Sequence, residues 1–156
     1  MQLIDILTPQ RTRCGVTGVS KKRVLHLVSE VLAETRPEID ALNVFDHLTK
    51  REKLSSTGLG NGVAIPHGRC DCIEDILAVL IKTDDPIDFD SPDRKPVDLI
   101  FALLVPTQAC DEHLQALSAL AQLLDSEQTR QKLRAASDSK ELYRLVCELD
   151  QPRASA

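Results

Sequence analysis

Apolar residues recur every three or four positions along several stretches of the chain, and this period predicts amphipathic helices. Ser20 is placed to cap the first of them, and Pro37 suits the first turn of the second. The predicted helices cover residues 21–35, 38–50, 111–126, 127–135 and 139–150. From 38–50 and 111–126, the side chains expected to face the core are Leu42, Phe45, Leu48, Leu114, Leu117, Leu120, Ala121 and Leu124.

Runs of apolar, branched residues predict strands at 63–65, 76–81 and 97–105, with 86–89 as a further candidate. The run 97–105 is apolar at nearly every position, which is typical of a strand buried on both faces. Residues 84–98 hold six aspartates and three prolines, which is typical of turns and edge strands. Helices before, between and after strands predict one α/β domain over residues 1–156. Its expected form is a three-layer α/β/α sandwich around a mixed, mainly parallel sheet.

Glycine is concentrated in one place, because four of the six glycines lie within the eleven residues 58–68. Alternate glycines permit positive φ angles and close approach of the backbone. The dinucleotide fingerprint would need a glycine where Val63 stands and a helix where a strand is predicted, and the Gly-Lys-Ser/Thr of a P-loop is absent. The glycines therefore do not indicate a nucleotide site, and they surround His67, which lies between Pro66 and Gly68.

Two histidines follow predicted strands: His67 comes after 63–65, and His113 lies in the first turn of the helix after 97–105. If these strands run parallel, both histidines face one crevice at the carboxyl edge of the sheet, and the helix N-terminus there favours an anion. Arg51 leads into the glycine stretch and could add a guanidinium that binds phosphate oxygens. Taken singly, the alternatives are a surface histidine for His67, a core histidine for His113 and a solvated cation for Arg51. Together the three suit phosphoryl transfer to a neutral imidazole.

The charge balance argues against several classes of protein. With 19 basic and 24 acidic side chains the net charge is −5, which disfavours a general nucleic-acid binder, and the aromatic content of 3% offers few stacking platforms. No run approaches the ~20 apolar residues of a membrane span. The first residues lack the basic start and apolar stretch of a signal peptide. We therefore expect no nucleic-acid partner, no membrane span and a cytoplasmic location.

Five cysteines, at positions 14, 70, 72, 110 and 147, show no framework spacing, and in a reducing compartment they are expected to be free thiols. Two alternatives stay open. Cys70, Cys72 and Cys110 with the two histidines could bind zinc, although their spacing does not match the common zinc patterns. The same thiols could instead sense oxidants. The aspartates of 88–93 lack the glycine and glutamate of a calcium loop, so we expect no metal.

The run from Arg51 to Gly68, which ends in Gly-Asn-Gly-Val-Ala-Ile-Pro-His-Gly, resembles the active-site signature of the fructose/mannitol-type enzyme IIA domains of the bacterial phosphoenolpyruvate-dependent phosphotransferase system. Three softer similarities point to the nitrogen-regulatory branch of that family: Ser20-Lys-Lys-Arg, Ala102-Leu-Leu-Val-Pro and His113-Leu-x-x-Leu-Ser. The resemblance extends over about residues 3–150.

The resemblance implies a mannitol/fructose IIA-like fold, no cofactor, and a role for each of three residues. His67 would accept the phosphoryl group from a histidine phosphocarrier protein as a tele-phosphohistidine, His113 would support that group, and Arg51 would stabilise its charge. Members of the nitrogen branch act chiefly as regulators whose phosphorylation state changes their binding to targets such as potassium transporters or sensor kinases. The alternatives are a sugar-specific component that passes the group to a separate IIB domain, and a binding module that accepts no phosphate.

Overall fold

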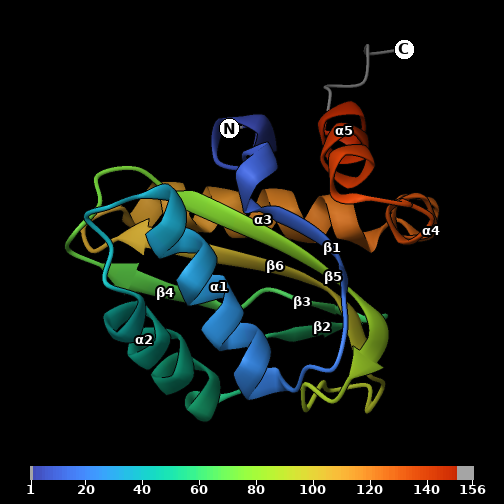
Figure 1. The fold of residues 1–156 in the computed structure, drawn as a ribbon, viewed down its shortest axis with the longest axis horizontal. Coiled ribbons are helices and arrows are strands. Elements are labelled where there is room, and N and C mark those ends of the chain that lie inside the picture. The colour runs from blue at the N-terminus through green and yellow to red at the C-terminus, as the bar shows by residue number, and fades with distance from the viewer. Residues whose placement is uncertain (1, 151–156) are drawn as a thin grey trace.

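A mixed sheet crosses the whole molecule in the computed structural model, which describes residues 2–150 (Figure 1). Its strands are β1 (Thr12–Val16), β2 (Gly58–Gly60), β3 (Val63–Ala64), β4 (His67–Cys70), β5 (Leu77–Ile87) and β6 (Val97–Pro106). Their order is β1-β5-β6-β3-β2, with β4 also paired to β6. Three pairs are parallel, β1 with β5 and both β3 and β4 with β6, whereas β5 with β6 and β2 with β3 are antiparallel.

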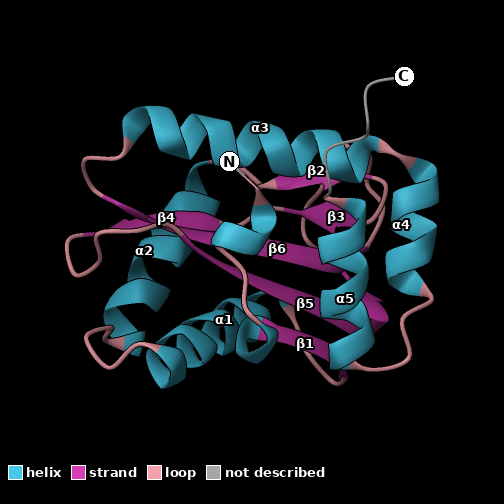
Figure 2. Cartoon of the chain, turned by 90° about the horizontal axis from the view of Figure 1, so that it is seen from above, coloured by secondary structure: helices cyan, strands magenta, loops and turns pink. Residues whose placement is uncertain are grey.

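Helices cover both faces of this sheet (Figures 1 and 2). They are α1 (Lys21–Thr35), α2 (Ala41–Leu54), α3 (Cys110–Asp125), α4 (Glu127–Arg134) and α5 (Ser139–Leu149), with short 3₁₀ turns at Leu3–Asp5 and Pro9–Arg11. One apolar core lies between the sheet and α1 and α2, and a second lies between the sheet and α3, α4 and α5. The predicted three-layer α/β/α sandwich with a mixed sheet is therefore confirmed.

Strand β6 contributes to both cores by simple alternation. Leu99, Phe101 and Leu103 face α3, whereas Ile100 and Ala102 face α1 and α2. All five side chains are at most 1% exposed, which explains why the run is apolar at nearly every position. Because directly paired residues of neighbouring strands share a face, the register of β6 also decides which side chains of β4 point toward α3.

Capping residues fix where the first two helices begin. Helix α1 covers the predicted residues, and the Ser20 hydroxyl accepts the Arg23 amide at 3.2 Å. Helix α2 begins later than predicted, because the Asp40 carboxylate caps it by accepting the Leu42 amide at 3.1 Å.

Two side chains that were predicted to face the core are exposed. Leu42 is 70% exposed because α2 buries the stripe through Val44 and Leu48, which lies on the opposite side of the helix. Leu114 is 66% exposed because the buried stripe of α3 runs through Ala116 and Leu120. Leu114 lies roughly 140° around the helix from the centre of that stripe.

The strands β1, β2 and β4 were not predicted, because their sequences are short, polar or glycine-rich and show no period of two. For the site, β4 matters most. Pro66 lies between β3 and β4, which keep one register against β6: Ala64 pairs with Ile100, and His67 with Leu103. The Pro66 carbonyl accepts the Leu103 amide at 2.9 Å, but proline has no N–H to donate, so the strand is interrupted there. His67 thus follows β3 as predicted, but it also begins a further strand.

Candidate functional site

The ring of His67 is held in one orientation by a backbone carbonyl. His67 pairs with Leu103, so its side chain points to the face covered by α3. Its Nδ1 lies 2.9 Å from the carbonyl oxygen of Ile65. Because a carbonyl oxygen only accepts hydrogen bonds, Nδ1 carries the proton and donates it. Nε2 of the neutral ring therefore carries the free lone pair.

Burial and positive charge favour the neutral form of this ring. The pKa of His67 is lowered from its ordinary value chiefly because the half-buried ring loses solvation of its charged form. The bond to Ile65 and the carboxylate of Glu52 act in the opposite direction, and the nearby guanidinium groups of Arg51 and Arg69 lower the pKa further. A neutral imidazole with a free Nε2 is a nucleophile.

His113 lies against His67, as the parallel arrangement of β3 and β6 predicted. The two ring centroids are 5.3 Å apart and the rings meet edge to face at 63°. His113 is in the first turn of α3 and is 9% exposed, and its Nε2 has no hydrogen-bond partner among the described residues. Burial, together with the charges of His67 and Arg69, lowers the pKa of His113 as well. A buried imidazole nitrogen without a partner is free to bind a ligand oxygen.

Arg51 reaches the same site from the last turn of α2. Its Nη1 donates to the Ser55 carbonyl at 2.9 Å, which holds the side chain along the end of the helix. Arg51 and His67 line one cavity of about 390 Å³ between α2, the glycine segment and α3. The other residues lining it are Ser56, Thr57, Gly58, Leu59, Ile65, Leu117, Ser118 and Ala121. The structure thus places Arg51 and His67 at one cavity, whereas His113 contacts the His67 ring without lining that cavity.

The carboxylate of Glu52, whose burial was not predicted, binds Thr57 in the segment that follows Arg51. Glu52 is 8% exposed, and its carboxylate accepts both the amide and the hydroxyl of Thr57 and pairs with Lys21 Nζ at 3.0 Å. Glu52 continues the buried positions Val44 and Leu48 of α2 at steps of four. A charged residue on an apolar stripe is the sequence signal that marks a paired, buried group.

The glycine segment packs so closely that side chains are excluded at two positions. A Cβ at Gly58 would overlap Ser91, and one at Gly62 would overlap the guanidinium of Arg134. Gly62 also has a φ of +80°, which side-chain-bearing residues rarely adopt. The Arg134 guanidinium binds Asp98 at 3.0 Å and the Asn61 carbonyl at 2.6 Å, so α4 holds the turn between β2 and β3. Of these two glycines, Gly58 lines the cavity beside His67.

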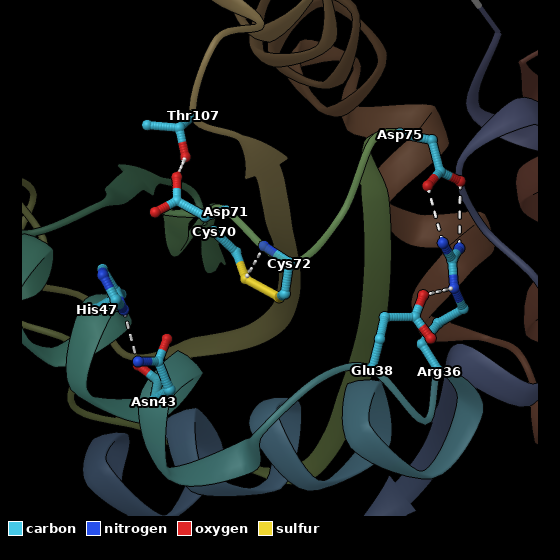
Figure 3. Close-up of a disulfide and its surroundings, with 9 residues drawn as sticks. All are labelled: Arg36, Glu38, Asn43, His47, Cys70, Asp71, Cys72, Asp75 and Thr107. Atoms are coloured by element: carbon cyan, nitrogen blue, oxygen red, sulfur yellow. Dashed lines mark hydrogen bonds and ion pairs between the residues drawn. A yellow bond between two sulfur atoms is a disulfide. The ribbon is translucent and has the colours of Figure 1, made fainter.

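The expectation of free thiols is wrong for two of the five cysteines. Cys70 and Cys72 form a disulfide, because β4 ends at Cys70 and the chain turns at once (Figure 3). The turn brings their Cα atoms to 5.4 Å, within the usual range for a disulfide. Cys14 and Cys147 are free thiols as expected, and the side chain of Cys110 lies outside the described residues.

No group of three potential metal ligands comes together within the described part of the chain. The zinc alternative had relied on the sulfurs of Cys70 and Cys72, which here are bonded to each other. Among residues 2–150, no helix is both long enough and apolar enough to cross a membrane.

The chain is similar to proteins of one family along nearly its whole length. Residues 5–148 match the family model described as "Phosphoenolpyruvate-dependent sugar phosphotransferase system, EIIA 2". A nitrogen regulatory protein of Pseudomonas aeruginosa is 44% identical over 149 residues, which are 96% of this chain and 97% of that protein.

Solved structures of similar proteins extend this comparison to the fold. The crystal structure of the nitrogen regulatory protein IIA-Ntr from Neisseria meningitidis matches with a TM-score of 0.85 and 40% identity, over 92% of this chain and 99% of that one. The crystal structure of IIA mannitol from Escherichia coli shares the fold, with a TM-score of 0.75, 21% identity, and coverage of 89% of this chain and 97% of that one.

Proposed function

The chain belongs to the EIIA 2 family of the phosphoenolpyruvate-dependent sugar phosphotransferase system, and from this we infer that it is a phosphoryl-accepting regulatory component of that system. We propose that Nε2 of His67 is the accepting atom, so that the protein works through a phosphohistidine intermediate. The observation that carries this proposal is the bond between Nδ1 of His67 and the Ile65 carbonyl, which leaves the lone pair on Nε2.

The transfer we propose is a direct displacement between two histidines. The Nε2 lone pair of His67 attacks the phosphorus of a phosphohistidine on a histidine phosphocarrier protein. As the new P–N bond forms, the P–N bond to the carrier breaks, and the carrier's nitrogen keeps the electron pair. The proton on Nδ1 stays in its bond to Ile65 throughout, so the ring needs no rearrangement.

Two neighbouring groups supply the electrostatics that phosphoryl transfer requires. His113 presents a buried Nε2 without a partner, and when that nitrogen carries the proton it donates to an oxygen of the phosphoryl group. Arg51 lines the cavity beside His67 and adds a fixed positive charge that attracts the phosphoryl oxygens.

Regulation follows from the charge that the modification adds. A phosphoryl group brings about −1.5 to −2 charges at neutral pH to a chain of net charge −5. Partners that contact the His67 surface will therefore distinguish the two forms. The targets we propose are regulatory ones, potassium transporters or sensor kinases, in the cytoplasm. The two relatives reported above that exceed 25% identity are both nitrogen regulatory proteins, which favours this role over that of a sugar-specific donor to a IIB domain.

The proposed function is tested by following phosphate from phosphoenolpyruvate to the chain. With enzyme I and the phosphocarrier present, we expect one acid-labile phosphate per chain, because phosphohistidine hydrolyses in acid. Intact-mass spectrometry before and after a brief acid treatment measures it, and omission of the phosphocarrier is the control. A wild-type chain that gains no phosphate would show that it is a binding module instead.

Replacing Arg51 tests the electrostatic part of the site. We expect Arg51→Gln to raise the pKa of His67 toward its ordinary value, because a neighbouring positive charge is removed. Only the neutral ring attacks, so the transfer rate drops when acidification protonates His67. In this variant the drop should occur at a higher pH than in the wild type. At neutral pH the rate falls about tenfold, because the charge on the phosphoryl oxygens loses its partner.

NMR titration of the His67 ring measures the pKa, and a pH series of transfer rates measures the consequence. Lys53→Gln is the matched control, since Lys53 is an exposed cation in the same helical turn. Equal pKa values for His67 in Arg51→Gln and in the wild type would contradict the role given to Arg51.

A further inference from the structure

The disulfide between Cys70 and Cys72 lies on the strand that carries the acceptor. His67 is the first residue of β4 and Cys70 is the last. Cys72 follows after a single residue, and its sulfur is bonded to that of Cys70 (Figure 3). We propose that Cys70 and Cys72 are a reversible dithiol–disulfide site whose oxidation state sets the rate of phosphoryl transfer to His67. The link to the transfer rate rests on the function proposed above, whereas the redox chemistry of the pair does not.

The two sulfurs differ in their access to solvent. Cys70 is 5% exposed and packs into the core beneath α1 and α2, whereas Cys72 is exposed. Both line a surface cavity of about 340 Å³, together with Asp40 and His47 of the α2 region. An external oxidant or reductant therefore reacts first with the Cys72 sulfur. Cys70 is the attacking thiolate when the disulfide forms and the leaving group when it is reduced.

A hydrogen bond within the turn stabilises negative charge on the Cys70 sulfur. The amide of Cys72 donates to the Cys70 sulfur at 3.2 Å, so a negative charge on that sulfur has a hydrogen-bond donor already in place. When a thiolate attacks Cys72, the Cys70 sulfur is the leaving group. Stabilisation of its charge makes the disulfide easier to open.

Oxidation by a hydroperoxide closes the bond in two steps. The Cys72 thiolate attacks the peroxide, an S–O bond forms, the O–O bond breaks, and the departing alkoxide takes a proton to become an alcohol. The Cys70 thiolate then attacks the Cys72 sulfur, the S–S bond forms, and hydroxide leaves and takes the second proton to become water. The two thiols lose two electrons and two protons, and the peroxide gains them.

A reducing dithiol reverses the change by thiol–disulfide exchange. Its first thiolate attacks Cys72 and forms a mixed disulfide while the Cys70 thiolate leaves. In the mixed disulfide, the second thiolate of the dithiol attacks the dithiol sulfur that is bonded to Cys72. This attack releases the Cys72 thiolate, and the dithiol becomes a disulfide. Each step exchanges one S–S bond for another, and the protons pass from the dithiol to the two cysteines.

Two connections join this turn to the acceptor site. The first is β4 itself, which pairs with β6 from His67 to Cys70. The second passes through Thr107, whose hydroxyl donates to the carboxylate of Asp71 (Figure 3). The Thr107 carbonyl accepts from Nη1 of Arg69 at 3.1 Å. Thr107 immediately follows β6 and leads into α3, the helix that carries His113. The turn is therefore bonded to the segments that position both histidines.

The disulfide restricts the turn between these connections, and the paired histidines described above belong to the oxidised form. Reduction gives the Cys72 side chain and the turn more conformations, which weakens the contact between Asp71 and Thr107. We therefore expect the reduced chain to transfer at a rate about threefold lower or more, the size of effect that one coupled contact typically carries.

The first measurement locates the redox change. The full chain is reduced with dithiothreitol, freed of it, and divided into samples with and without hydrogen peroxide. Trypsin cuts after Arg69 and Lys82, so the two cysteines share the peptide 70–82. We expect this peptide to alkylate twice before peroxide, not at all after it, and twice again after a second reduction. If the peptide alkylates twice after peroxide, the redox site does not exist.

The second measurement compares the acceptor site in the two forms. Transfer rates and the NMR signals of the His67 and His113 rings are recorded for the reduced and the oxidised chain. Cys72→Ser, an exposed position, should remain slow with or without peroxide. The variant with both Cys14→Ser and Cys147→Ser should respond as the wild type does, because those thiols lie outside the disulfide.

Equal rates and identical ring signals in both forms would overturn the coupling. If neither form accepts phosphate, the proposed function fails. Alkylation of the peptide 70–82 still decides whether Cys70 and Cys72 are redox-active, and the ring signals still decide whether their oxidation state affects His67 and His113.

Discussion

His67→Ala is expected to abolish phosphate incorporation from phosphoenolpyruvate, because the variant lacks the nitrogen that forms the new P–N bond. The loss should reach the detection limit, since the other nearby imidazole, His113, is 9% exposed at the N-terminal turn of α3 and therefore poorly accessible to a carrier protein. Intact-mass spectrometry after incubation with enzyme I and the phosphocarrier measures the result. Circular dichroism confirms that the variant is folded.

The matched control for this prediction is His47→Ala. His47 also has its Nδ1 bonded to a backbone carbonyl, that of Asn43 at 2.8 Å, but it lies on α2, outside the cavity that His67 shares with Arg51. The His47→Ala variant should incorporate phosphate as the wild type does. Full incorporation by His67→Ala would move the acceptor to another residue, and a mapped phosphopeptide containing His113 would exchange the roles of the two histidines.

Much of this site was predictable from local sequence. The glycine segment and Pro66 drew attention to His67, although Gly68 is buried against α2 and does not expose the backbone. The apolar run 97–105 predicted both the central strand β6 and the entry to α3. The prediction that His67 and His113 meet needed only that two strands run parallel, which the pairing of β3 and β6 confirms. Short-range patterns suffice here because strand polarity fixes where each strand end lies.

Other features depend on contacts between distant segments and have no local signal. Strand β4 reads His-Gly-Arg-Cys and is a strand only because its backbone pairs with β6. The burial of Glu52 depends on Lys21, which lies in another helix. The disulfide depends on a tight turn whose Cα separation cannot be known from the spacing of Cys70 and Cys72 alone.

The exposure of Leu42 shows the limit of a periodic pattern. A leucine at helical spacing is buried only if it lies near the centre of the face that packs on the sheet. Leu42, Phe45 and Leu48 stand three positions apart, so they spread over roughly 120° of the helix surface. The buried stripe of α2 runs at steps of four through Val44, Leu48 and Glu52, and it leaves Leu42 exposed.

His113→Ala is expected to slow phosphoryl transfer about 100-fold while leaving the chain folded, because it removes the donor we assign to a phosphoryl oxygen. Its Nε2 has no partner among the described residues, so the unphosphorylated chain loses little hydrogen bonding when the ring is removed. The melting temperature should then fall by no more than about 3 °C, since packing around the small gap accounts for most of the change.

A conservative variant separates the two interpretations of this residue. His113→Gln fills much of the same space and keeps an N–H donor, so it should recover part of the rate that His113→Ala loses. Single-turnover transfer from the phosphorylated carrier measures the rate, and thermal unfolding measures the stability. A large fall in melting temperature for both variants, with the transfer rate of the folded protein unchanged, would make His113 a core histidine. A rate that follows the presence of the donor, at nearly constant stability, assigns to His113 the electrostatic role at the phosphoryl group.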